Sequence, residues 1–213
     1  MAVLSREEFD AIEFDAAANG DHQAAARRMS KLAVTGTQTD SMPRSEAFLR
    51  AGEQWLLADD PAAAASGFRL ALADGGPVFV DPRVPLARAL FMLGKSDEAQ
   101  SLLDNLKGEG RRDPRTCDLV AELLVERSDL NGALEWATAG VELCLQRMNK
   151  SVPAQREPSP DEDAGPSTRS AWPAAAAREE AEAELRLLLS LRYRIRNDLG
   201  LPEDRYDGLL DDV

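Results

Sequence analysis

Side chains that commonly perform catalysis are scarce in this chain of 213 residues. It has one histidine, His22, in the segment Asn19-Gly20-Asp21-His22, and two cysteines, Cys117 and Cys144. A histidine titrates near neutral pH and suits acid–base work, but catalysis also needs a partner group held beside it. We interpret His22 as a polar residue in or near the first turn of a helix, where backbone N–H groups lack partners.

The two cysteines lie in apolar segments. Two cysteines are too few for a disulfide framework or a four-cysteine zinc site, and Cys117 and Cys144 are too far apart in sequence for a redox pair. Free cysteine behaves as a small apolar residue unless its surroundings favour the thiolate. We therefore expect two buried structural thiols.

Acidic residues form short runs, such as Asp161-Glu162-Asp163 and Asp211-Asp212. A calcium loop of the EF-hand type needs alternating ligands, a central glycine and a distal glutamate, which these runs lack. The motifs HExxH, GxSxG, GxGxxG and GxxxxGK[ST] do not occur in the sequence. We predict a protein that is not an enzyme and that uses no metal or cofactor.

The charge balance excludes further classes of function. Lys and Arg number 25 against 38 Asp and Glu, which gives a net charge of −13. Such a field repels polyanions, so we expect neither a nucleic-acid partner nor a membrane, and a nucleic-acid-associated accessory protein is the weakest alternative. The sequence shows no secretory signal and no long apolar run, which predicts a cytoplasmic protein.

Composition favours helices throughout, because aromatic residues make up only 5% of the chain and alanine and leucine are abundant. One stretch differs: residues 149–172 contain four prolines and almost no aliphatic side chain. We predict a flexible linker there. It separates a helical body, residues 5–148, from a C-terminal helix, residues 173–199, and an acidic tail, residues 200–213.

The body has an internal repeat. Three alanines, Ala64, Ala99 and Ala133, recur 35 and then 34 residues apart. Two helices pack closely where small residues meet at their crossing. The expected pairs of small residues are Gly52 with Ala64, Ala87 with Ala99, and Ala121 with Ala133. We expect larger residues to fill the space between successive pairs, namely Trp55, Phe68, Leu90 and Leu103.

This pattern resembles the tetratricopeptide repeat (TPR) family, whose unit of about 34 residues is a pair of antiparallel helices. The likeness covers residues 45–78, 80–113 and 114–147, and an atypical copy over about residues 6–39 has Glu13 at a small-residue position. The resemblance implies an all-α, right-handed superhelix of antiparallel helix pairs. Each pair is too small to be stable alone, so stacking makes the core.

TPR arrays bind a peptide or another protein along the concave surface of their first helices, and the resemblance implies the same here. By repeat spacing the predicted groove residues are Leu49, Glu53, Leu56, Val84, Arg88, Phe91, Asp118, Glu122 and Val125. Some members hold a C-terminal carboxylate with cations and amides, but here Glu53 and Glu122 stand at such positions and only Arg88 could serve. We predict a non-catalytic adaptor or scaffold that binds an apolar or amphipathic segment, as a helix in a groove.

The predicted C-terminal helix has a broad apolar face that must be covered. Its docking residues are Leu185, Leu188, Leu191, Ile195 and Leu199. We expect the helix to dock on the body, in its groove or over the last repeat, with a second copy of the chain as the competing partner. The alternative function is therefore a structural or oligomerisation module whose groove its own C-terminal helix fills.

Basic residues surround Tyr193 in the run from Arg192 to Arg196. Interleaved basic and aromatic residues are typical of nucleic-acid binding, but we interpret these arginines as surface charge that matches the helix dipole. The run from Arg192 to Pro202 also resembles segments of actinobacterial proteins that carry a SEC-C zinc motif. The cysteine cluster that defines that motif is absent here.

Overall fold

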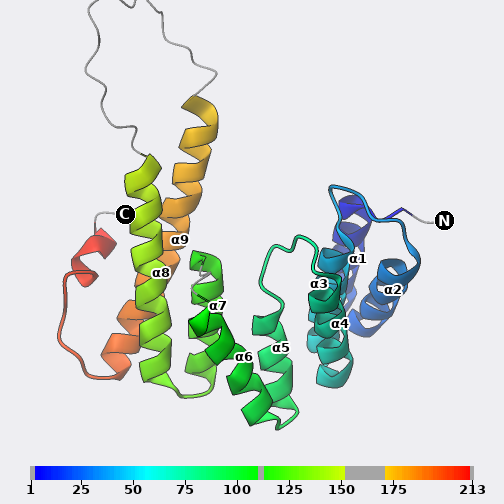
Figure 1. Cartoon of the computed structure of the whole chain (residues 1–213), viewed down its shortest axis with the longest axis horizontal. Helices are drawn as coiled ribbons and strands as arrows, with labels where there is room; N and C mark the ends of the chain where they lie inside the picture. Colours follow the sequence, from blue (N-terminus) through cyan, green and yellow to red (C-terminus); the bar gives the residue numbers. More distant parts are fainter. Residues whose placement is uncertain (1–2, 110–112, 152–170, 212–213) are drawn as a thin grey trace, which may run out of the picture. The chain divides into compact units, whose positions relative to one another are not determined.

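The computed structural model describes residues 3–109, 113–151 and 171–211, and the regular elements in these ranges are all helices (Figure 1). The all-α prediction is confirmed. The chain divides into two compact units, Met1–Gly110 and Arg111–Val213. Most of the predicted linker, residues 152–170, lies outside the described residues.

The first unit is a series of antiparallel helix pairs, in which each helix packs against the next one along the chain. The helices are α1 (Arg6–Asn19), α2 (His22–Thr35), α3 (Arg44–Leu57), α4 (Pro61–Asp74), α5 (Arg83–Met92) and α6 (Ser96–Gly108). Figure 1 shows α3 and α4 side by side, with α2 next to them. One pair corresponds to each of the first three predicted repeats, with α3 beginning one residue before the predicted 45–78.

Local sequence signals set the helix ends. The hydroxyl of Ser5 accepts a hydrogen bond from the backbone N–H of Glu8, 3.1 Å away, and so caps the start of α1. The carboxylate of Asp60 caps α4 in the same way, with Ala63 as the donor. At the end of α1, Gly20 has a φ of 73°, a left-handed conformation that glycine adopts without steric cost.

The three repeat alanines, Ala64, Ala99 and Ala133, are fully buried, as the repeat predicts. The crossing of α3 and α4 is closer than the paired small residues suggest. A Cβ atom built on Gly52 would lie 2.5 Å from the ring of Phe68, and one on Gly67 would lie 3.3 Å from the Cα of Gly52. Gly52 therefore leaves room for the phenylalanine ring, and Gly67 lets the backbones of α3 and α4 approach each other closely.

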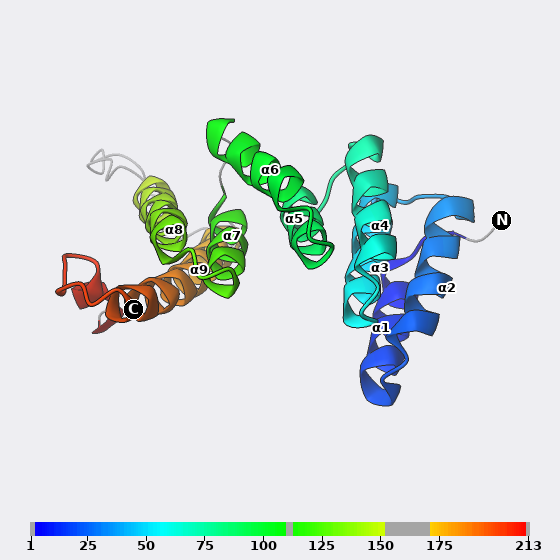
Figure 2. The ribbon, with the colours of Figure 1, turned by 90° about the horizontal axis from the view of Figure 1, so that it is seen from below.

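The second unit consists of α7 (Pro114–Glu126), α8 (Leu130–Ser151), α9 (Ala171–Asp198) and a short 3-10 helix, η1 (Asp207–Asp211). The structure places α9 beside both α7 and α8 (Figure 2). The long C-terminal helix thus docks within its own chain, on the last predicted repeat. Its observed bounds differ from the predicted 173–199 by two residues at the start and one at the end.

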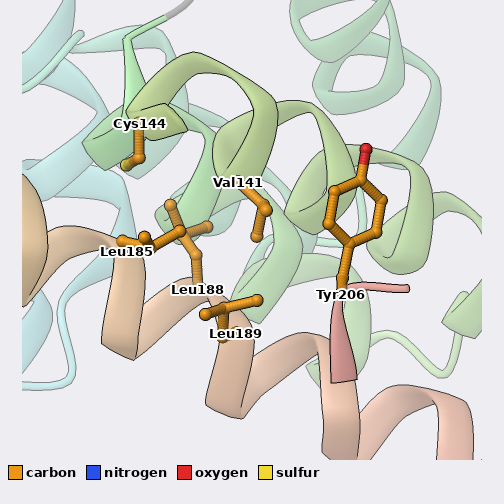
Figure 3. Close-up of a cluster of buried hydrophobic side chains, with 6 residues drawn as sticks. All are labelled: Val141, Cys144, Leu185, Leu188, Leu189 and Tyr206. Carbon is orange, nitrogen blue, oxygen red and sulfur yellow. The ribbon is translucent and has the colours of Figure 1, made fainter. Parts of the chain in front are cut away.

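A cluster of apolar side chains joins α8, α9 and the tail (Figure 3). It contains Val141, Cys144, Leu185, Leu188, Leu189 and Tyr206. Of the predicted docking face, Leu199 is half-buried and the other four residues are buried. A Cβ atom on Gly140 would lie 2.7 Å from Leu188, so this glycine lets α9 approach α8 closely. Both cysteines are buried and free, as predicted.

Two arginines at the end of α9 contradict the interpretation of the run from Arg192 to Arg196 as surface charge. Arg192 and Arg196 are only 4% and 8% exposed, so they are not surface charge. Gly200, with a φ of 65°, reverses the chain and brings the tail back along α9. The carboxylates of Asp204 and Asp207 then bind both guanidinium groups. Part of the acidic tail is therefore a folded element.

Candidate functional site

The structure places the predicted groove residues at very different depths. Leu49 and Val84 are 1% and 3% exposed, so they pack inside the first unit and offer no surface to a partner. Leu56, Arg88, Phe91, Asp118 and Val125 are half-buried, and Glu53 and Glu122 are exposed. Residues from α3 and α5 belong to the first unit, whereas Asp118, Glu122 and Val125 of α7 belong to the second. The predicted groove residues are therefore divided between two surfaces, one on each unit.

Helix α3 exposes a row of residues that is rotated from the one the repeat spacing predicts. Because α2 and α4 both pack against α3, most of its circumference is covered. Its accessible row consists of Glu46, Arg50, Glu53 and Leu57, which follow one another at intervals of four, three and four residues. Leu49 lies outside this row and is turned into the helix packing. The repeat gives the period of the surface, but the neighbouring helices decide its angle.

Arg50 connects this row to α1. Its Nε donates to Glu13 Oε1 at 2.8 Å, and its Nη2 lies 2.6 Å from Asp10 Oδ1 and 2.5 Å from Glu13 Oε2. The guanidinium also lies 5.6 Å from the centre of the Phe9 ring, within the range of a cation–π contact. The Arg50 side chain is only 13% exposed. In the sequence, the departure of Glu13 from the repeat pattern was the available sign of this role.

Glu53 has unusual electrostatics for a residue on an exposed face. Partial desolvation of its carboxyl group raises its pKa to about 7, and repulsion from Glu13 and Glu46 acts in the same direction. The nearby charge of Arg50 lowers the pKa and only partly offsets these effects. Glu53 thus exchanges a proton near neutral pH while its side chain keeps contact with solvent.

Two large apolar side chains stand beside these charges. Leu57, one turn after Glu53, is 61% exposed, and Phe14, four residues after Asp10 on α1, is 75% exposed. Residues four apart lie on one face of a helix, so Phe14 shares the face of α1 that Arg50 contacts through Asp10. We call Asp10, Glu13, Phe14, Arg50, Glu53 and Leu57 the α1–α3 strip. Repeat spacing predicted Leu56, one position before Leu57, and it predicted no groove residue in the atypical copy that contains Phe14.

The surface of α7 is different, because α9 lies beside it. Desolvation raises the pKa of Asp118 to about 6. Repulsion from Glu122 on α7 and from Glu184 on α9 raises this pKa further. The Glu184 carboxylate is 4.0 Å from the Nε of Arg115 and 3.3 Å from Nη1 of Arg147. Charged groups of the chain itself therefore surround this part of the predicted groove.

A second polar cluster lies where the tail returns to α8 and α9. Arg192 Nη2 is 2.5 Å from Asp204 Oδ2, and its Nε donates to the hydroxyl of Thr138 at 3.0 Å. The Tyr206 ring lies 4.7 Å from the Arg192 guanidinium, and its hydroxyl donates to Glu142 Oε1 at 2.8 Å. These contacts hold the tail against α8 and α9. The N–H groups of the arginines donate to groups of the same chain.

His22 is the first residue of α2, which agrees with its predicted place in a first helical turn. Its Nδ1 lies 3.0 Å from Oε1 of Gln54 on α3. Among the described residues, no three or more histidine, cysteine or acidic side chains are grouped to hold a metal ion. Within the same residues, no helix has the length and hydropathy needed to cross a membrane.

Comparison with known proteins adds no relative. No protein-family model matches the chain, and no curated protein matches it. The TPR resemblance therefore rests on the repeat residues alone.

Proposed function

We propose that this chain is a non-catalytic scaffold that binds a segment of another protein on the α1–α3 strip of its first unit. The observation that carries the proposal is the exposure of Phe14 and Leu57, 75% and 61%, on the two helices that the Arg50 ion pairs connect. Large apolar side chains beside fixed charges are typical of surfaces that another protein covers.

The ion pairs that hold Arg50 in place favour this use. Arg50 is held by Asp10 and Glu13, and the two helices that carry the strip are packed against α2. A surface whose side chains are already ordered loses little conformational entropy when a partner binds. The strip is therefore suited to binding a short segment without rearrangement.

A second candidate function is structural, and one observation favours it for the second unit. There α9 buries Leu185, Leu188 and Ile195, and its Glu184 acts on Asp118 of the predicted groove. The chain's own helix thus occupies the space beside α7. We assign partner binding to the first unit and a self-contained structural role to the second.

The test compares proteins that co-purify with three forms of the full chain. Replacing both apolar residues, Phe14→Ser with Leu57→Ser, removes the apolar part of the strip without opening a cavity, because both side chains are exposed. Val34→Ser is the matched control, since Val34 is 63% exposed on α2. We expect a partner that is retained by the wild type and by Val34→Ser and lost with the double variant. Identical sets of proteins with all three forms would contradict the proposal.

A further inference from the structure

We propose that the partner segment presents a lysine or arginine to Glu53, set among apolar residues that contact Phe14 and Leu57. This inference rests on the proposed function and names the chemistry of its partner. The geometry that supports it is the order of groups along the strip: Leu57 follows Glu53 by one helical turn, and Glu13, which acts on the Glu53 carboxyl group, directly precedes Phe14. An exposed apolar side chain thus lies one helical turn after Glu53 on α3, and another directly follows Glu13 on α1.

The carboxylates on and beside the strip differ in whether they already have a partner. Arg50 is the cation at its centre, and both of its carboxylate partners, Asp10 and Glu13, are already bound to it. Glu46 accepts a hydrogen bond from the backbone N–H of Phe79, 2.9 Å away. Among the described residues, Glu53 forms no hydrogen bond and no ion pair. Both oxygens of the Glu53 carboxylate are therefore open to a ligand.

Covering Glu53 with a partner increases its need for a compensating cation. An apolar segment lying on Phe14 and Leu57 would take still more water from Glu53, which costs free energy unless a cation or a proton compensates the charge. A cation also relieves the repulsion from Glu13 and Glu46, whereas an acidic side chain would add to it. The strip therefore discriminates by charge as well as by hydrophobicity.

This electrostatic argument favours another protein over a second copy of the chain. Two identical strips facing each other would bring two Glu53 carboxylates and their acidic neighbours together, in a chain whose net charge is −13. A basic amphipathic segment meets no such repulsion. The occupant is thus a cationic, partly apolar segment of a different protein.

The probe is a displayed library of helical peptides of about 18 residues, or five turns, with one apolar face and a fully randomised central position on that face. The full chain selects binders at about pH 8, where Glu53 is mostly ionised. Recovered peptides are then synthesised, and their dissociation constants are measured for four proteins. These are the wild type, Glu53→Gln, the Phe14→Ser and Leu57→Ser double variant, and Glu180→Gln, an exposed glutamate of α9 that serves as the control.

We expect lysine and arginine to dominate the central position, and Glu53→Gln to weaken these peptides by about tenfold while Glu180→Gln leaves them unchanged. Peptides that need Phe14 and Leu57 but show no preference for a cation would overturn the inference and leave the proposed function standing. Recovery of no peptide that depends on Phe14 and Leu57 would overturn the proposed function itself. Sedimentation showing a wild-type dimer that the double variant abolishes would assign the strip to a second copy and overturn the inference.

Discussion

At the residue scale, Glu53 shows how neighbouring helices can change an ordinary surface glutamate. Its pKa of about 7 arises from desolvation together with repulsion from Glu13 of α1 and from Glu46, which lies about two turns earlier on α3. The folded state therefore binds the Glu53 proton more tightly than the unfolded state does. A raised carboxyl pKa makes stability fall as pH rises between about 4.5 and 7.

Glu53→Gln tests this effect, because glutamine keeps the size of the side chain and cannot ionise. We expect the variant and the wild type to be equally stable near pH 4, where Glu53 is protonated in both states. Above pH 7 the variant should be more stable by roughly 0.5–1 kcal/mol, a value discounted for the solvent exposure of Glu53. Urea unfolding at several pH values measures the difference. A constant difference at all pH values would show that ionisation of Glu53 is not its cause.

Arg192 is a buried and fully paired cation, so its substitution should be costly. Its side chain is 4% exposed and binds Asp204, Asp207 and Thr138. Arg192→Met leaves Asp207, itself 8% exposed, with less compensation, so we expect the second unit to lose about 3 kcal/mol of stability. Arg178→Met is the control, because the Arg178–Glu182 pair is exposed and should contribute about 0.5 kcal/mol or less. Equal effects of the two substitutions on urea unfolding would contradict this difference.

At the level of single helices, the crossings depend on small residues. Ala99 is fully buried on α6 in the pair that α6 forms with α5. Ala99→Leu adds three carbon atoms to a closely packed interface and should destabilise the first unit by about 1–3 kcal/mol. The matched substitution is Ala73→Leu, at an exposed position of α4. Thermal unfolding should separate the two variants clearly, and an unchanged melting temperature for Ala99→Leu would argue against a tight crossing.

Helices were easier to predict from this sequence than surfaces. Capping residues such as Ser5 and Asp60 act on the backbone next to them, so they mark helix ends without knowledge of the rest of the fold. The accessible row of α3 depends instead on α2 and α4, which is why Leu49 was predicted to lie in a groove and is buried. The residues that stay exposed are those that neighbouring helices do not cover, and short-range sequence patterns do not determine which these are.

The tail was missed for a related reason. Arg192 and Asp204 lie 12 residues apart, and acidic residues after a helix are normally solvated. Their pairing depends on the reversal at Gly200 and on the place that Tyr206 finds against α8. Arginines four residues apart, followed by a glycine and by two aspartates three residues apart, were the available signal. That signal has meaning only once the chain is known to turn back.

At the scale of the whole molecule, the chain contains two units whose apolar surfaces are used differently. The second unit covers its large apolar face with its own α9, whereas the first leaves Phe14 and Leu57 exposed. The burial of about five large side chains at roughly 1.5–3 kcal/mol each makes α9 worth on the order of ten kcal/mol to its unit. We therefore expect α7 and α8 to depend on α9.

Ending the chain at Ser151 tests this dependence, since it removes α9 and the tail and exposes Val141 and Cys144. We expect the shortened protein to lose stability, to bind the dye ANS through its exposed apolar surface, and to bind a synthetic peptide of residues 171–211. The same peptide with Leu188→Asp is the control, because Leu188 lies at the centre of the contact (Figure 3). Unchanged melting and no binding of either peptide would show that α9 does not support the unit.

Because both cysteines are buried, the rate at which they react can be used to measure how often the second unit opens. Both thiols of the chain are there and both are buried, and burial raises the pKa of Cys144 to about 12, so the native protein offers a reagent almost no Cys144 thiolate. Alkylation can then proceed only through transient opening of the α7, α8 and α9 packing. The labelling rate under native conditions should report the frequency of that opening, and a mass spectrum taken during the reaction should show whether Cys117 and Cys144 become reactive together or one at a time.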